Sequence, residues 1–228
     1  MLQPSPSHLL TGVALAKTVP TFFSLSLACR EPAERSKGPP SALSPGTKHV
    51  LITKMSEQLL VFGGSGHAKD VLAAATTQGY RRFRIVTSDG SCAVPGMEAL
   101  PESAFDPADF RDWTCIAAIG HNGDRRRFHE DYPELRFTSI IAASAVVAGT
   151  ARIGPGCYIG PFAYIGPDVV LGAGCIVNTH SIVGHDASAG DFSHIGPQCC
   201  LSGHVHLGSD VTVGAGAIFN NGSYAKPL

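Results

Sequence analysis

A six-residue repeat runs through the second half of the chain and constrains its fold more than any other feature. Aliphatic residues, with one alanine among them, recur at every sixth position from Val147 to Val213, and glycine follows most of them. This period is typical of a solenoid in which each hexad supplies one short strand and one corner, and three hexads close a triangular coil. Glycine suits the corner because it tolerates a positive φ and takes no side-chain space. The twelve hexads therefore predict about four coils with the aliphatic side chains stacked inside.

A different pattern precedes the repeat, in which short apolar runs alternate with segments of helical spacing. Strands are expected at 58–62, 83–87 and 115–119, and helices at 67–78 and about 124–132. Such alternation predicts a small parallel, Rossmann-like sheet, whose ligands bind at the carboxyl ends of its strands. We expect an α/β domain over residues 55–138 and the solenoid domain over residues 139–228.

The turn after the first expected strand, GGSGHAKD, lacks the third glycine of the dinucleotide fingerprint, because Lys69 or Asp70 stands in its place. A complete NAD site is therefore not expected. Backbone N–H groups ahead of a helix still suit a phosphate or a uracil edge, so a mononucleotide fits this turn. The alternative is a tight turn that binds nothing.

Charge and cysteine content narrow the partners and the compartment. The formal net charge of −1 offers no field that would gather nucleic acid or anionic lipid. Seven cysteines show no CxxC spacing, which favours reduced thiols in a cytoplasmic protein.

The first 54 residues are rich in Pro, Ser and Thr and show no periodicity, which predicts a disordered extension or a mis-set start codon before Met55. The apolar stretch from Val13 to Cys29 is interrupted by Lys17 and Pro20, has no basic region before it and is too short to span a bilayer. No membrane association is expected.

Three segments carry a resemblance to a known family: VFGGSGHAKDV at 61–71, AAIGHNGDRRR at 117–127, and NTHSIVGHDASAGDFSHIGPQCCLSGHVHLG at 178–208. Together they resemble the bacterial sialic acid O-acetyltransferases and UDP-4-amino-sugar N-acetyltransferases, which are hexapeptide-repeat enzymes. The resemblance implies a left-handed parallel β-helix after the α/β domain. It also implies a homotrimer with active sites between subunits.

The resemblance implies acetyl transfer from acetyl-CoA to the amino group of a UDP-4-amino sugar. His185 would be the general base, Asp186 would support the imidazolium, and Asn178 would line the reacting site. Histidine suits this role because it exchanges a proton near neutral pH. Asp186 is one methylene shorter than the Glu of close relatives.

Further residues match the ligand-binding positions of that family. His194 and the backbone of Gly203 would contact acetyl-CoA. The nucleotide-sugar would lie against Ser65, Gly66, His67, Ser88, Asp89 and Gly120. The early end of the repeat, with no hexad pattern in NNGSYAKPL, predicts an incomplete acetyl-CoA site. His180, His204 and His206 are expected to be structural or to face solvent.

Other functions remain open from the sequence. The same base would serve O-acetylation of a sialic acid or a related sugar, and a silent nucleotide-sugar scaffold would keep the same fold. A gamma-class carbonic anhydrase needs three zinc ligands, and Ser144 stands where its further histidine is required, so no metal is predicted. A nucleotidyltransferase would need a Gly-rich, Arg-containing turn that the α/β domain lacks.

Overall fold

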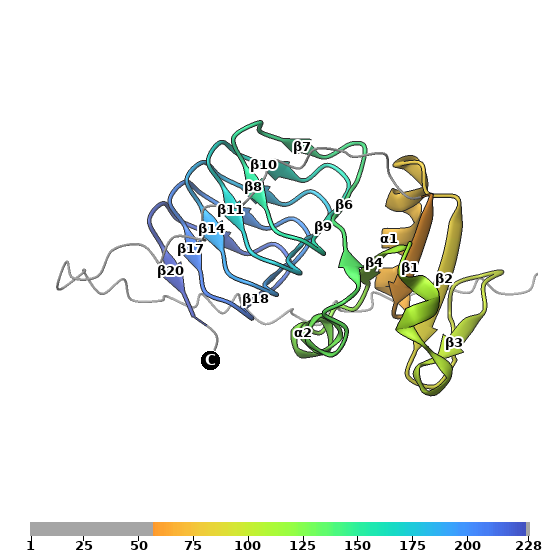
Figure 1. Ribbon diagram of the computed structural model, residues 1–228. Helices are drawn as coiled ribbons and strands as arrows, with labels where there is room; N and C mark the ends of the chain where they lie inside the picture. The colour runs from red at the N-terminus through yellow and green to blue at the C-terminus, as the bar shows by residue number, and fades with distance from the viewer. Residues whose placement is uncertain (1–56, 227–228) are drawn as a thin grey trace, which may run out of the picture. The chain divides into compact units, whose positions relative to one another are not determined.

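The computed structural model describes residues 57–226, which form a small α/β unit followed by a solenoid of parallel strands (Figure 1). The expectations for residues 1–54, including Cys29, lie outside the described residues. Within the described range, no helix has the length and apolarity that a membrane span requires.

The amino-terminal sheet has five parallel strands in the order β3-β2-β1-β4-β5. They are β1 (Gln58–Phe62), β2 (Arg82–Thr87), β3 (Ala99–Pro101), β4 (Thr114–Ala117) and β5 (Arg136–Phe137). The helices are α1 (Gly66–Thr77), α2 (Asn122–Asp131) and two 3-10 helices, Glu102–Ala104 and Pro107–Phe110. The predicted parallel sheet is confirmed, while β3, β5 and the 3-10 helices are too short to show a period in the sequence.

Strand β1 is buried on both faces, which explains its continuous apolar run. Leu59 and Val61 pack in a cluster with α1 and the start of the solenoid, whereas Leu60 and Phe62 pack against the α2 side, where Phe62 stacks on Phe128. Alternate residues of a strand point to opposite faces, so this one strand serves two cores.

The solenoid consists of fifteen two-residue strands, each six residues after the last, and each pairs in parallel with the strand three further along. Sheet I contains β6 (Ile140–Ile141), β9 (Tyr158–Ile159), β12 (Ile176–Val177), β15 (His194–Ile195) and β18 (Thr212–Val213). Sheet II contains β7 (Val146–Val147), β10 (Tyr164–Ile165), β13 (Ile182–Val183), β16 (Cys200–Leu201) and β19 (Ile218–Phe219). Sheet III contains β8 (Arg152–Ile153), β11 (Val170–Leu171), β14 (Ser188–Ala189), β17 (His206–Leu207) and β20 (Tyr224–Ala225). The solenoid predicted from the hexads is confirmed, and so is the left-handed parallel β-helix that the resemblance implies (Figure 1).

The repeat is longer than the sequence pattern predicted. Three strands to a coil make five coils rather than about four, because β6 precedes the Val147 hexad and two strands follow Val213. The expectation that NNGSYAKPL lies outside the pattern is wrong, since β20 lies within it and pairs with β17. Ala225 takes the inward position there, and its small side chain gives a weak periodic signal.

The glycines that follow the inward aliphatics have a different role from the one predicted. Their φ angles are not positive. From Gly154 on, the left-handed conformation lies two residues later in the hexad, at Gly156 and Gly174 and at non-glycine corners such as Asp186 (φ 59°). A Cβ on Gly154 would lie 2.6 Å from the carbonyl carbon of Gly172 in the next coil. Most of these glycines are therefore needed for the close approach of successive coils, whereas a Cβ on Gly214 would meet nothing within 4 Å.

The outward side chains of the three sheets differ in character. On sheet I, Ile140, Tyr158 and Ile176 are buried in the cluster that contains α1. Sheet III carries a mixed set, namely Arg152, Val170, Ser188, His206 and Tyr224. Sheet II presents an apolar stripe made of Val146, Tyr164, Ile182, Cys200 and Ile218. We call these five residues the sheet II stripe.

Replacing Gly154 with alanine is expected to lower the free energy of unfolding by about 1–3 kcal/mol, because the new methyl group must displace the backbone of the next coil. The matched control is Gly214→Ala at the same hexad position, where a Cβ would meet nothing within 4 Å. That control should be neutral, or stabilising by about 0.4–1 kcal/mol. Urea unfolding of both variants measures the difference, and equal effects would contradict the close-approach explanation.

Candidate active site

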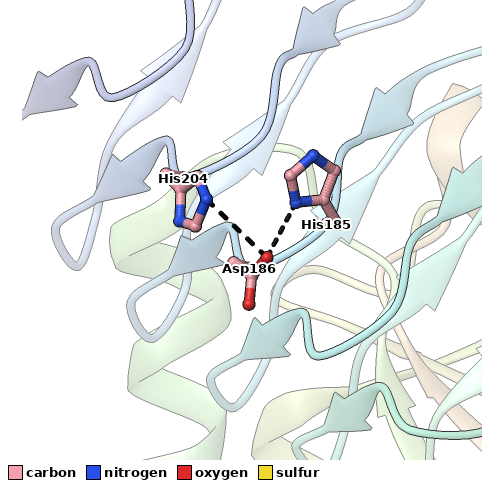
Figure 2. A group of neighbouring side chains, drawn as sticks. All are labelled: His185, Asp186 and His204. Atoms are coloured by element: carbon pink, nitrogen blue, oxygen red, sulfur yellow. Dashed lines mark hydrogen bonds and ion pairs between the residues drawn. The ribbon is translucent and has the colours of Figure 1, made fainter.

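The corner after β13 brings together three polar side chains that the sequence places on two coils. His185 and Asp186 lie at this corner, and His204 lies at the same corner position as Asp186, one coil later. Nδ1 of His185 is 2.7 Å from Oδ2 of Asp186, and Nε2 of His204 is 3.8 Å from the same oxygen (Figure 2). All three side chains are exposed, so a substrate can reach them.

The carboxylate fixes the tautomer of the neutral His185 ring. The hydrogen bond from His185, supported by the charge of His204, holds the pKa of Asp186 below its ordinary value. An ionised carboxylate only accepts hydrogen bonds, so we assign the proton of neutral His185 to Nδ1. Nε2 is then free to accept a proton. The side chain of Asp186, although one methylene shorter than Glu, is long enough to contact the His185 ring.

Gly203 makes room for this ring. A Cβ at Gly203 would lie 2.6 Å from Nε2 of His185, so a side chain there would collide with the nitrogen that faces away from Asp186. The predicted contact between Gly203 and acetyl-CoA stays a prediction. Asn178 follows β12, and its Oδ1 accepts a hydrogen bond of 2.8 Å from the backbone N–H of Thr179, which ties the side chain to its own corner.

A second group of predicted residues meets where the α/β unit contacts the solenoid. His194 begins β15, and its Nδ1 lies 3.2 Å from the carbonyl oxygen of Gly120, which follows β4. His67, in the first turn of α1, lies edge-to-face against Tyr158 of β9, with ring centroids 5.0 Å apart. Nε2 of each histidine is buried and has no hydrogen-bond partner among the described residues.

Burial keeps these histidines neutral. Desolvation, with smaller contributions from His194 and Arg125, lowers the pKa of His67 to about 4. Desolvation also lowers the pKa of His194, against the opposing effect of its bond to Gly120. A neutral imidazole with a free nitrogen can hydrogen-bond either to a water or to a polar group of a bound sugar.

Arg125 of α2 holds this junction together from a position that is only 1% exposed. Its guanidinium donates to the carbonyl oxygens of Ile119 and Gly120 at the end of β4, and to those of Gly174 and Phe192 in the solenoid. The side chain therefore joins the two parts of the chain at fixed distances.

A pocket of about 600 Å³ lies at the carboxyl ends of the amino-terminal strands. Of the predicted nucleotide-binding residues, Ser65, Ser88 and Asp89 line it, whereas Gly66, His67 and Gly120 are not among its lining residues. Asp89 accepts hydrogen bonds from the backbone N–H and the hydroxyl of Ser91, which lower its pKa and fix the loop after β2. Arg127 also lines the pocket, where its guanidinium is paired with the carboxylates of Glu102 and Asp131.

Comparisons with known proteins agree with this architecture. Residues 150–185 match the profile of the bacterial transferase hexapeptide family (six repeats). PerB from Caulobacter crescentus, solved with CoA and GDP-perosamine, is 26% identical over 75% of this chain and 92% of its own, with a TM-score of 0.67. A mutant of perosamine N-acetyltransferase from the same organism, also solved with CoA and GDP-perosamine, is 26% identical over 74% and 90% of the two chains, with a TM-score of 0.66.

The acetyltransferase domain of PglB from Neisseria gonorrhoeae FA1090, in complex with acetyl coenzyme A, is 27% identical over 75% of this chain and 96% of its own, with a TM-score of 0.61. The chain is an acyltransferase. The resemblance to sugar acetyltransferases of the hexapeptide-repeat type is confirmed. Comparison with curated protein sequences finds no match.

The positions of two residues of this acyltransferase were not predicted from the sequence. His204 is exposed, as expected for a residue that faces solvent, and it also lies beside Asp186 because one coil is eighteen residues long. Counting eighteen residues on from Asp186 would have found it. Arg125 stands in a run of three arginines, and nothing in the sequence separates the buried one from its neighbours.

Acid is expected to destabilise the acyltransferase through His67 and His129. Burial lowers the pKa of both to about 4, below the value of about 6.5 in an unfolded chain. The unfolded state then binds more protons below about pH 6.5, so stability falls as the pH drops towards 4, by about 2 kcal/mol for each histidine at pH 5.

Chemical unfolding at pH 7 and pH 5 measures this effect. The variant His129→Gln should lose part of the pH dependence, whereas His206→Gln, an exposed histidine of sheet III, should keep it. The same pH dependence in His129→Gln as in the wild type would contradict the role of His129.

Proposed function

We propose that this chain transfers the acetyl group of acetyl-CoA to an amino group of a nucleotide-linked sugar. The observation that carries the proposal is the 2.7 Å contact between Nδ1 of His185 and Asp186, which leaves Nε2 as a base on an exposed corner of a hexapeptide solenoid. The solved relatives support the substrate classes, since one is a perosamine N-acetyltransferase bound to CoA and GDP-perosamine and another is bound to acetyl coenzyme A.

In the proposed reaction, Nε2 of His185 takes a proton from the amine while the amine nitrogen attacks the thioester carbonyl carbon. The carbon–sulfur bond then breaks, and the proton returns from the imidazolium to the CoA sulfur. Asp186 stabilises the positive charge that His185 carries between these two steps. The transfer itself requires no metal.

The nucleotide would occupy the pocket at the strand ends, against Ser65, Ser88 and Asp89. Gly66, His67 and Gly120 would then face the sugar, because His67 and Gly120 lie by His194 at the junction with the solenoid. The proposal leaves two candidates for the nucleobase of the sugar nucleotide, uracil and guanine. The sequence resemblance predicts UDP, whereas the Caulobacter relatives were solved with GDP-perosamine.

We also propose a homotrimer formed through the sheet II stripe. Val146, Tyr164, Ile182 and Ile218 are 59%, 41%, 43% and 72% exposed, and a contiguous apolar stripe favours burial against a partner. His185 follows β13 of this sheet, so a neighbouring subunit would lie beside the base and help to form the acetyl-CoA site.

The described cysteines support the predicted compartment. All six are free thiols, as a reducing environment favours. A cytoplasmic location remains part of the proposal.

Replacing His185 with glutamine is expected to lower kcat about 10²–10⁴-fold, because the side chain can no longer take the proton. CoA release and product mass should be followed with UDP-4-amino sugars, GDP-perosamine and a sialic acid as acceptors. The matched control is His180→Gln, since Gln198 already occupies the same corner position one coil later. Full activity in His185→Gln would overturn the mechanism, and a product formed only from the sialic acid would replace N-acetylation with O-acetylation.

The variant Ile182→Lys is expected to convert the trimer into monomers, because it places a charge in the middle of the sheet II stripe. The control Ser188→Lys makes the same change on the neighbouring strand of sheet III. Size-exclusion chromatography with light scattering gives both masses. A monomeric wild-type chain, or a trimer that survives Ile182→Lys, would contradict this interface.

A further inference from the structure

Asp186 is shared by two imidazole rings from successive coils. Figure 2 shows its carboxylate between His185 and His204, with Oδ2 at 2.7 Å from the first ring and 3.8 Å from the second. The two rings lie edge-to-face, with centroids 5.3 Å apart. In the proposed transfer, His185 and Asp186 have roles, whereas His204 has none.

The backbone holds these three residues in place. His204 N–H donates to the carbonyl oxygen of His185 at 3.0 Å, which is part of the ladder between coils. Asp186 and His204 both adopt the left-handed corner conformation, with φ of 59° and 56°. The ligand atoms are therefore carried by rigid corners and need only side-chain rotation to converge.

Two imidazole nitrogens and one carboxylate oxygen are a donor set that suits zinc. One ligand atom from each residue lies within 4.8 Å of the others, so small rotations bring all three to a common ion at about 2.0–2.2 Å. The three side chains are 57%, 45% and 54% exposed, which leaves a path for the ion and a fourth position for water.

We propose that His185, Asp186 and His204 form a zinc site that switches off the acetyl transfer. The inhibition of acetyl transfer rests on the proposed function, whereas the binding of zinc does not. In the metal-bound state Nδ1 of His185 is a ligand, so the neutral ring carries its single proton on Nε2. That nitrogen then has no lone pair for the proton of the amine, and the ion also draws Asp186 away from its role.

Two other exposed histidines of the solenoid lie outside the proposed zinc site. His206 is 2.8 Å from the Ser188 hydroxyl oxygen through Nδ1, and His180 stacks on Phe162. Neither belongs to the cluster of three possible ligands. His206→Gln is therefore the matched control for His204→Gln, because both remove an exposed histidine from the same region of the solenoid.

Binding is tested with full-length, tag-free protein treated with a chelator and then dialysed. Calorimetric titration with zinc chloride should show a site that binds one ion per chain, and cobalt(II) should give the absorption spectrum of a bound tetrahedral ion. His204→Gln should weaken binding about 10–100-fold or more, while His206→Gln should bind as the wild type does. Thermal unfolding of each metal-free variant checks that the fold is intact.

The inhibition arm measures CoA release as zinc is added and then removed with EDTA. Zinc should suppress transfer reversibly in the wild type, and the concentration for half inhibition should rise at least about tenfold in His204→Gln. The absence of a wild-type site, or equal binding by His204→Gln and His206→Gln, would overturn the inference. Zinc that binds at this site without slowing transfer would overturn the switch.

The two proposals fail separately. A metal-free protein that transfers no acetyl group would remove the proposed function, while the titration and the cobalt spectrum would still decide the metal site. An active enzyme with no zinc site would leave the function standing.

Discussion

The junction between the α/β unit and the solenoid depends on one buried cation. Burial lowers the pKa of Arg125 to about 10, so the guanidinium stays charged at neutral pH. A buried charge is tolerated only when its hydrogen bonds are made, and here backbone carbonyls from both parts of the chain make them. Because Gly120 is one of these partners, the distance from β4 to His194 is set by the same side chain.

This cation also explains the state of the histidines around it. Arg125 contributes to the lowered pKa of His67, His129 and His194, since a second positive charge beside it would be unfavourable. The junction therefore holds neutral rings, whereas the exposed corner at His185 has a carboxylate next to its ring. In the proposed reaction, the corner would carry out the proton transfer, and the neutral rings at the junction would contact uncharged polar groups of the sugar.

Much of the fold is predictable from the sequence because the inward aliphatic residues set the strand register directly. The sequence does not distinguish a glycine needed for its φ from one needed for close packing, so the role of Gly154 was misassigned. Ala225 carries too little apolar surface to extend the pattern. Predicting the partners of Asp186 requires knowing which residues stack one coil apart, and predicting the burial of Arg125 requires the tertiary contacts themselves. The roles of the site residues and the domain boundaries stay predictions.

Each solenoid strand pairs with the strand three positions later, so the length of the chain before a corner fixes where that corner lies. Three hexads make one triangular coil, so adding one hexad ahead of β13 would move His185 to a different edge of the solenoid. Adding eighteen residues would return His185 to the same edge of the solenoid. It would also move His185 by one coil along the solenoid axis, away from the contacts of Arg125. The number of hexads between the contacts of Arg125 and His185 therefore fixes both the edge and the level at which His185 lies.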